Sequence, residues 1–143
     1  MKALTCDLRR IDALAETLRP RPEKSVIDGL FANDQTLSLS TVFVAEIAYG
    51  VEKIRHEERS PRLQSSLGDW WRRFAGRIYG FDGEASLIYN PIIGMAYRMS
   101  RRVEVPDGMI AAVALRKNAS LATRKIGRFT QINLSLINPW DDR

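Results

Sequence analysis

Residues 36–54 read TLSLSTVFVAEIAYGVEKI and contain the pattern that decides the fold. The first five residues alternate between polar and apolar side chains, as a strand with one buried face does. Ser40 or Thr41 can then cap a helix that runs to about Ile54. A strand that leads directly into a helix is the repeating unit of α/β proteins. This stretch therefore predicts an α/β fold.

The same alternation extends on both sides of this stretch. Before it, ALTC (3–6) predicts a strand, and helices are expected at about 8–18 and 24–32, the first of them ended by Pro20 and Pro22. Strands separated by helices imply right-handed crossovers and a mostly parallel sheet that is covered on both faces. After it, we expect helices at 63–75, 83–101 and 106–117 and strands at 77–81, 120–123 and 134–138.

The length and composition indicate a single domain. The chain has 143 residues, of which 45% are hydrophobic, enough to fill one core without a metal or disulfide staple. It has one cysteine, Cys6, and we see no secretory leader, a combination typical of the reducing cytoplasm. No apolar run is long enough to span a membrane. We therefore expect residues 1–143 to form one cytoplasmic domain.

The counts of reactive side chains disfavour several classes of active site. His56 is the only histidine and lies in the charge run KIRHEER (53–59), which is typical of a solvated helix end. This argues against catalytic triads and against zinc sites that need histidine. The glycine-rich phosphate motifs GxGxxG and GxxxxGK[ST] are both absent. Carboxylates remain as candidates, and their oxygens suit hard cations such as Mg²⁺ or Mn²⁺.

Two acids stand out on the predicted scaffold. Glu46 has Phe43 and Tyr49 three residues away on either side, so its carboxylate lies within or beside an apolar stripe, where it needs a cation, a donor or a proton. Asp107 follows Pro106 in the first turn of an otherwise apolar helix. Each has a purely structural alternative, since Glu46 could lie at an exposed helix edge and the helix dipole alone favours Asp107.

Five motifs of the chain follow one another in a specific order and spacing. They are TVFVAEIAYGVEKI (41–54), FAGRIYGFD (74–82), VPDGMIAAVAL (105–115), LATR (121–124) and LINPW (136–140). In this combination the chain resembles PIN-domain ribonucleases of the VapC/FitB toxin group, from about Ala15 to Trp140. The resemblance implies a three-layer α/β/α sandwich with a central, mostly parallel sheet. It also implies cleavage of RNA by a water that bound Mg²⁺ or Mn²⁺ activates, and a cognate antitoxin that inhibits the enzyme.

Members of this family usually carry four acids. Glu46 and Asp107 match the second and third, so the resemblance assigns both to catalysis and to metal binding. The first acid has two candidates. Asp7 would end the first strand if three extra residues lie between it and the Arg19-Pro20 pair. An alignment without gaps instead places Arg10 at the expected position and Asp12 where the family has the Asn that follows. We take Asp7, Glu46 and Asp107 as the expected metal ligands.

Basic residues stand where the fourth acid is expected. Lys125 directly follows LATR and Arg128 comes three residues later, at positions where active relatives have Asn or Asp. At 4 Å and an effective dielectric of about 20, one lysine would repel a divalent ion by roughly 8 kcal/mol.

Three functions are therefore open. The first is a Mg²⁺-dependent endoribonuclease toxin of a type II toxin–antitoxin system, with reduced activity. The second is a catalytically inactive PIN domain that binds RNA or an antitoxin, with Lys125 as the counter-ion of Glu46 and Asp107. The third is a nucleic-acid-binding module without metal, suggested only by the charge.

Two further features bear on partners. The net charge of +5 suits contacts with RNA phosphates. Adjacent Trp70 and Trp71 point about 100° apart on a helix. We expect one to pack in the core and the other to be partly exposed toward an antitoxin or the second subunit of a homodimer; the alternative is that both pack in the core. The candidate phosphate contacts are Arg72, Arg73, Arg77, Arg98, Arg101, Arg102, Arg116 and Lys117.

Overall fold

The computed structural model describes residues 38–122, 127, 129–130, 132 and 134–137. The strand expected at 3–6, the helices expected at 8–18 and 24–32, and the candidates Asp7, Asp12, Lys125 and Arg128 lie outside these residues. In chain order the described elements are β1 (Leu39–Ser40), α3 (Thr41–Lys53), α4 (Ser60–Arg73), β2 (Ile78–Tyr79), α5 (Gly83–Arg98), α6 (Val105–Arg116), β3 (Leu121–Ala122) and β4 (Leu136–Ile137).

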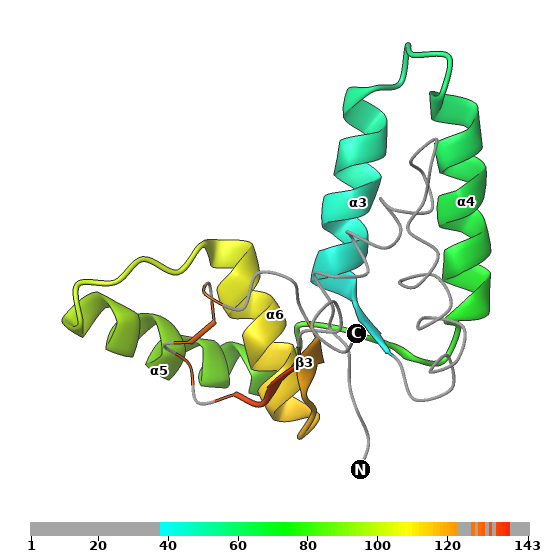
Figure 1. Cartoon of the computed structure of the whole chain (residues 1–143). Coiled ribbons are helices and arrows are strands. Elements are labelled where there is room, and N and C mark those ends of the chain that lie inside the picture. Colours follow the sequence, from blue (N-terminus) through cyan, green and yellow to red (C-terminus); the bar gives the residue numbers. More distant parts are fainter. Residues whose placement is uncertain (1–37, 123–126, 128, 131, 133, 138–143) are drawn as a thin grey trace.

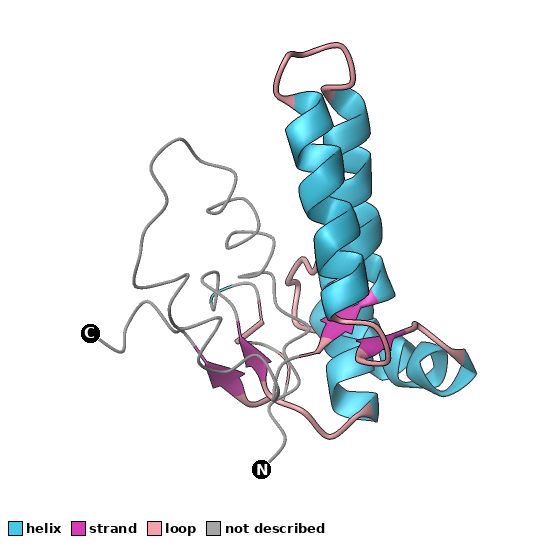
Figure 2. Ribbon diagram, turned by 90° about the vertical axis from the view of Figure 1, so that its right-hand side faces the viewer, coloured by secondary structure: helices cyan, strands magenta, loops and turns pink. Residues whose placement is uncertain are grey.

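The helices form two pairs. Helices α3 and α4 stand side by side as a hairpin, and α5 and α6 lie against each other beside its base (Figure 1). The described strands form two separate pairs (Figure 2): β1 pairs with β2 at the foot of the hairpin, and β3 pairs with β4 to one side of it. Both pairings are parallel, and helices separate β1 from β2 and β2 from β3. The predicted α/β class with parallel strands is confirmed.

Helix α3 begins where the sequence predicts it. Ser40 is extended and is the N-cap, and its side-chain oxygen accepts a hydrogen bond of 3.1 Å from the backbone N–H of Phe43. Phe43, Ile47 and Val51 are buried at intervals of four residues, so one face of the helix packs against the core. The strand and the helix therefore share Ser40, which is itself fully buried.

Two helices differ from their predicted ranges by three residues at one end. Helix α4 begins at Ser60 instead of 63, because Ser60 is buried and its hydroxyl accepts a hydrogen bond of 3.1 Å from the Gln64 side chain, while Pro61 suits a first turn. Helix α5 begins after its N-cap Asp82, as predicted, but ends at Arg98 instead of 101. Ser100 adopts a positive φ of 53°, which a helix does not continue through.

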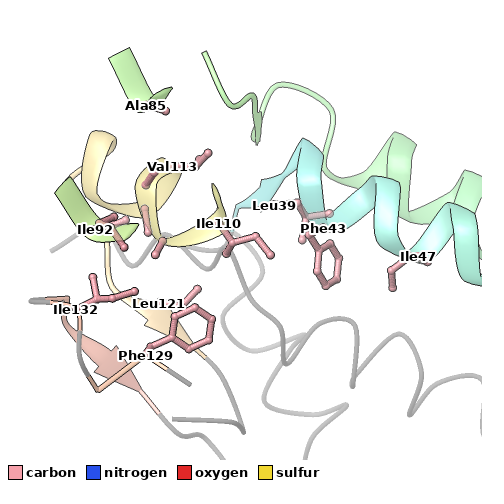
Figure 3. Packing of buried hydrophobic residues seen from close by; sticks show 14 of the residues in the cluster. Leu39, Phe43, Ile47, Ala85, Ile92, Ile110, Val113, Leu121, Phe129 and Ile132 are labelled. Carbon is pink, nitrogen blue, oxygen red and sulfur yellow. The ribbon is translucent and has the colours of Figure 1, made fainter. Parts of the chain in front are cut away.

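Helix α6 lies in the middle of the core. Residues 110–114 are five consecutive fully buried positions, and α6 contacts both α3 and α5. Figure 3 shows Ile110 and Val113 of α6 among buried residues of α5, β1, α3 and β3, with Phe129 and Ile132 nearby. A helix that is apolar all round must be enclosed on all sides, which fixes its position firmly. None of the described helices has both the length and the apolarity that a membrane crossing requires.

Candidate functional site

Glu46 lies in the second turn of α3, the helix that begins at the carboxyl end of β1. Its neighbours Phe43 and Ile47 belong to the buried stripe, whereas Tyr49 is exposed. Glu46 itself is half-buried. The carboxylate therefore lies beside the apolar stripe rather than within it, one of the two arrangements that the sequence allowed.

Asp107 is buried in the first turn of α6, with only 4% of its surface exposed. Among the residues that the structure describes, it is the only buried side chain that carries a charge. Burying a carboxylate costs several kcal/mol unless a cation or donors compensate it. A helix N-terminus favours an acid by about 0.3–1 kcal/mol at a surface and by up to about 2 kcal/mol where the acid is partly buried. The helix dipole alone therefore does not account for Asp107.

The position of Asp107 is set by the glycine that follows it. A Cβ atom on Gly108 would lie 2.9 Å from both Cε2 of Tyr89 and Cδ1 of Ile93, two side chains of α5. The Tyr89 ring is in turn edge-on to Phe81, with 5.9 Å between centroids. The first turn of α6 thus rests directly on α5. Sequence reasoning missed Gly108, because a close approach between two helices leaves no periodic signal on either one.

The structure brings the two predicted acids onto helices that touch each other. Helix α3 carries Glu46, α6 carries Asp107, and the two helices are in contact. Among the described residues, no cluster of three or more His, Cys, Asp or Glu forms that could hold a metal. Two carboxylates still match Mg²⁺, which commonly binds through one or two carboxylates and keeps several waters. We predict that the two carboxylates meet at the carboxyl ends of the parallel strands, where open α/β sheets bind their ligands.

Several of the candidate phosphate contacts have roles within the fold. Arg116 of α6 pairs with Glu84 of α5, and Lys117 lies over the Tyr79 ring with its Nζ 4.6 Å from the centroid. The Arg77 guanidinium lies 4.7 Å from the centroid of the Phe74 ring. These three cations consequently stabilise neighbouring elements. Their presence in the sequence is not by itself evidence of an RNA surface.

Trp71 is 53% exposed and lines a largely apolar pocket between α3 and α4, together with Phe43, Ile47 and Leu67. The side chain of Trp70 lies outside what the structure describes. Partial exposure of one tryptophan is therefore confirmed for Trp71. Its contact with a partner remains a prediction.

The arrangement defines a class of protein: a small α/β domain with parallel strands, whose two candidate acids lie near the starts of two helices that touch each other. Comparison with known proteins identifies the family within this class. No family model matches the chain. Plasmid stability protein StbB of Pseudomonas syringae pv. tomato is 32% identical over 132 residues, covering 91% of this chain and 95% of the relative. VapC ribonuclease Y4jK of Sinorhizobium fredii is 30% identical over 132 residues, covering 91% and 94%.

A solved structure agrees with these relatives. The chain superposes on the crystal structure of FitAcB from Neisseria gonorrhoeae with a TM-score of 0.83 and 30% sequence identity, covering 98% of this chain and 99% of the other. The chain therefore belongs to the PIN-domain VapC/FitB toxin family. Its fold, including the three-layer sandwich that the motifs implied, is the fold of that family.

Proposed function

We propose that this protein is a single-domain, Mg²⁺-dependent endoribonuclease toxin of a type II toxin–antitoxin system. The buried carboxylate of Asp107, on a helix that touches the helix of Glu46, is the observation that carries the proposal. The name of the relative Y4jK, a VapC ribonuclease, supports the same activity. The basic residues at the fourth-acid positions, Lys125 and Arg128, would reduce the activity but not abolish it.

In this proposal Glu46 and Asp107 hold the ion, with Asp7 as the third ligand. When bound, Mg²⁺ or Mn²⁺ supplies an activated water and a counter-charge for the scissile phosphate. The packing of Gly108 on α5 holds the backbone beside Asp107, which would limit how far its carboxylate has to reorganise when substrate binds. Glu46 is only half-buried and is therefore accessible to a bound RNA backbone.

We further propose that the protein acts in the cytoplasm, where an antitoxin inhibits it, and that it forms a homodimer. Helix α5 offers a surface for a second copy. Between Glu84 and Arg98 it carries no charged residue, and Leu87 and Met95 are exposed beside an apolar pocket that Pro91 also lines. An uncharged apolar surface can face its own copy without repulsion, as a two-fold interface requires.

A catalytically inactive PIN domain is the second candidate, and the observation that favours it is the charge reversal at Lys125 and Arg128. In that case Lys125 neutralises Glu46 and Asp107 in place of a metal. The protein would then bind RNA or its antitoxin without cutting RNA.

One experiment separates the two. We would incubate a mixed RNA pool with wild-type protein, Glu46→Gln and Asp107→Asn, with Mg²⁺ and with EDTA. Glu52→Gln is the matched control, because Glu52 lies on α3 as well but is exposed and paired with Arg55. The endoribonuclease proposal expects cleavage only by wild type and Glu52→Gln, and only with Mg²⁺. Cleavage that persists in Glu46→Gln or in EDTA would contradict the metal–carboxylate mechanism.

If no protein cleaves RNA, a second measurement is needed to test the metal site. Mg²⁺ binding to the folded state stabilises it by about 2.7 kcal/mol at a hundredfold excess over the dissociation constant. A thermal shift with Mg²⁺ that disappears in Asp107→Asn supports the metal site. No cleavage and no shift would favour the inactive domain.

A further inference from the structure

The last turn of α5 and the loop that follows it carry three arginines within five residues of an exposed aromatic ring. Tyr97 is 83% exposed, the highest value among the large hydrophobic side chains of the described residues. Arg98, Arg101 and Arg102 follow within five residues and are all exposed, against a single acid, Glu104. Figure 1 shows this loop in yellow, running from the outer end of α5 to the start of α6.

Two of these arginines are not used by the fold. Arg102 contacts Glu104 at 3.0 Å, but both side chains are more than half exposed, so the pair is weak. Within the described part of the chain, Arg98 and Arg101 have no ion-pair partner. Arg116 and Lys117, by contrast, are bound to neighbouring elements. The end of α5 and the loop after it therefore present two available guanidinium groups within four residues of an exposed tyrosine ring.

This combination fits one class of partner. Guanidinium groups bind phosphates in any nucleic acid, whereas an exposed ring gains energy only from a base whose face is free, as in a single strand. An acidic protein segment would use the arginines but would leave the ring without a counterpart. We propose that Tyr97, Arg98 and Arg101 form a binding surface for single-stranded RNA next to the candidate active site.

The location of this surface supports a role in guiding RNA to the candidate active site. The same loop continues into α6, and Asp107 comes six residues after Arg101, a separation of at most about 22 Å along the backbone. A strand held on the loop would thus extend over the first turn of α6 within a few nucleotides. This role rests on the proposed ribonuclease function, whereas the binding surface itself can be tested without it.

The test measures binding without cleavage. A fluorescein-labelled, mixed-sequence, 20-nucleotide single-stranded RNA is titrated with the full-length protein in EDTA, and anisotropy is followed from 50 to 200 mM salt. The test variants are Arg98→Gln/Arg101→Gln, Tyr97→Leu and Tyr97→Phe. Arg55→Gln/Arg59→Gln is the charge-matched control, because these residues pair with Glu52 and Glu57 at the opposite tip, between α3 and α4.

We expect two separable effects. Removing two phosphate contacts should lower the slope of log affinity against log salt by about 1.4. Tyr97→Leu should weaken binding roughly 5- to 150-fold, while Tyr97→Phe, which keeps the ring, should bind nearly as wild type does. All affected residues are exposed, so melting curves should match that of wild type.

The outcomes distinguish the proposed RNA-binding surface from the proposed ribonuclease function. If the loop variants bind like wild type, or if the control loses as much affinity as they do, the surface is wrong even when wild type cleaves RNA. Stronger binding of the matching duplex than of the single strand would also overturn it. If the loop variants lose affinity as expected and no protein cleaves RNA in Mg²⁺, the surface stands and the nuclease assignment fails.

Discussion

The contact of Gly108 with α5 makes a sharp prediction about a single methyl group. In Gly108→Ala the new Cβ would lie 2.9 Å from Tyr89 and from Ile93, closer than carbon atoms approach. The end of Ile93 can rotate away, but the Tyr89 ring is braced against Phe81. The first turn of α6 must therefore move outward, and Asp107 moves with it.

The size of the effect follows from two opposing terms. Overpacking a filled site costs about 1–3 kcal/mol, whereas replacing a helical glycine with alanine gains about 0.8 kcal/mol. Gly108→Ala should therefore lose about 1 kcal/mol of unfolding free energy. Gly50 is the matched control, since it also lies in a helix but a Cβ there would meet nothing within 4 Å. Gly50→Ala should gain about 0.8 kcal/mol.

Thermal unfolding followed by circular dichroism measures both variants. For a chain of this length, 1 kcal/mol corresponds to about 3 °C, so the two melting temperatures should differ by about 6 °C, with wild type between them. RNA cleavage should fall by up to about 100-fold in Gly108→Ala, because Asp107 is misplaced, and should stay unchanged in Gly50→Ala. If Gly108→Ala melts at or above wild type, α6 has room for the methyl group and the argument is refuted.

Three other predictions concern separate parts of the molecule. Ser40→Ala removes the cap on the Phe43 N–H and should lower the melting temperature by about 3 °C, or about 1 kcal/mol; an unchanged melt would show that the cap contributes nothing. Lys125→Asp should raise Mg²⁺-dependent RNA cleavage, and adding Glu46→Gln should abolish the gain; no rise would mean that Lys125 does not oppose the metal. Leu87→Arg should convert the proposed homodimer to monomer in light scattering, and a dimer that persists would place the interface elsewhere.

The sequence predicted the start of a helix well where a local signal marks it, for a physical reason. Ser40, Asp82 and Pro106 mark the starts of α3, α5 and α6 by local chemistry, and each helix begins within one residue of its signal. Each described strand has only two residues, shorter than the predicted runs. Alternation of side chains shows which residues could pair. The length that does pair depends on a partner strand far away in the sequence, which no local pattern contains.

The candidate site shows the same difference between features that local sequence determines and features that depend on distant parts of the chain. Glu46 and Asp107 could be chosen from their motifs, but not the burial of Asp107, which depends on α3 and α5 enclosing α6. The close approach at Gly108 depends on Tyr89. The exposure of Tyr97 depends on where α5 stops packing against the core. These properties arise from non-local packing, and the sequence alone predicted Glu46 and Asp107 but neither Gly108 nor Tyr97.

The parallel pairing of β1 with β2 constrains the order in which the chain folds. Residues 41–77 separate the two strands, and closing a flexible loop of this length carries a length-dependent entropy cost of about 3 kcal/mol. When α3 and α4 have already docked, the start of α3 and the end of α4 lie at the same end of the hairpin (Figure 1), and only residues 74–77 remain to be ordered. The remaining cost is about 1 kcal/mol. The helical hairpin therefore acts as a folding template, and substitutions that loosen it should slow refolding more than they accelerate unfolding.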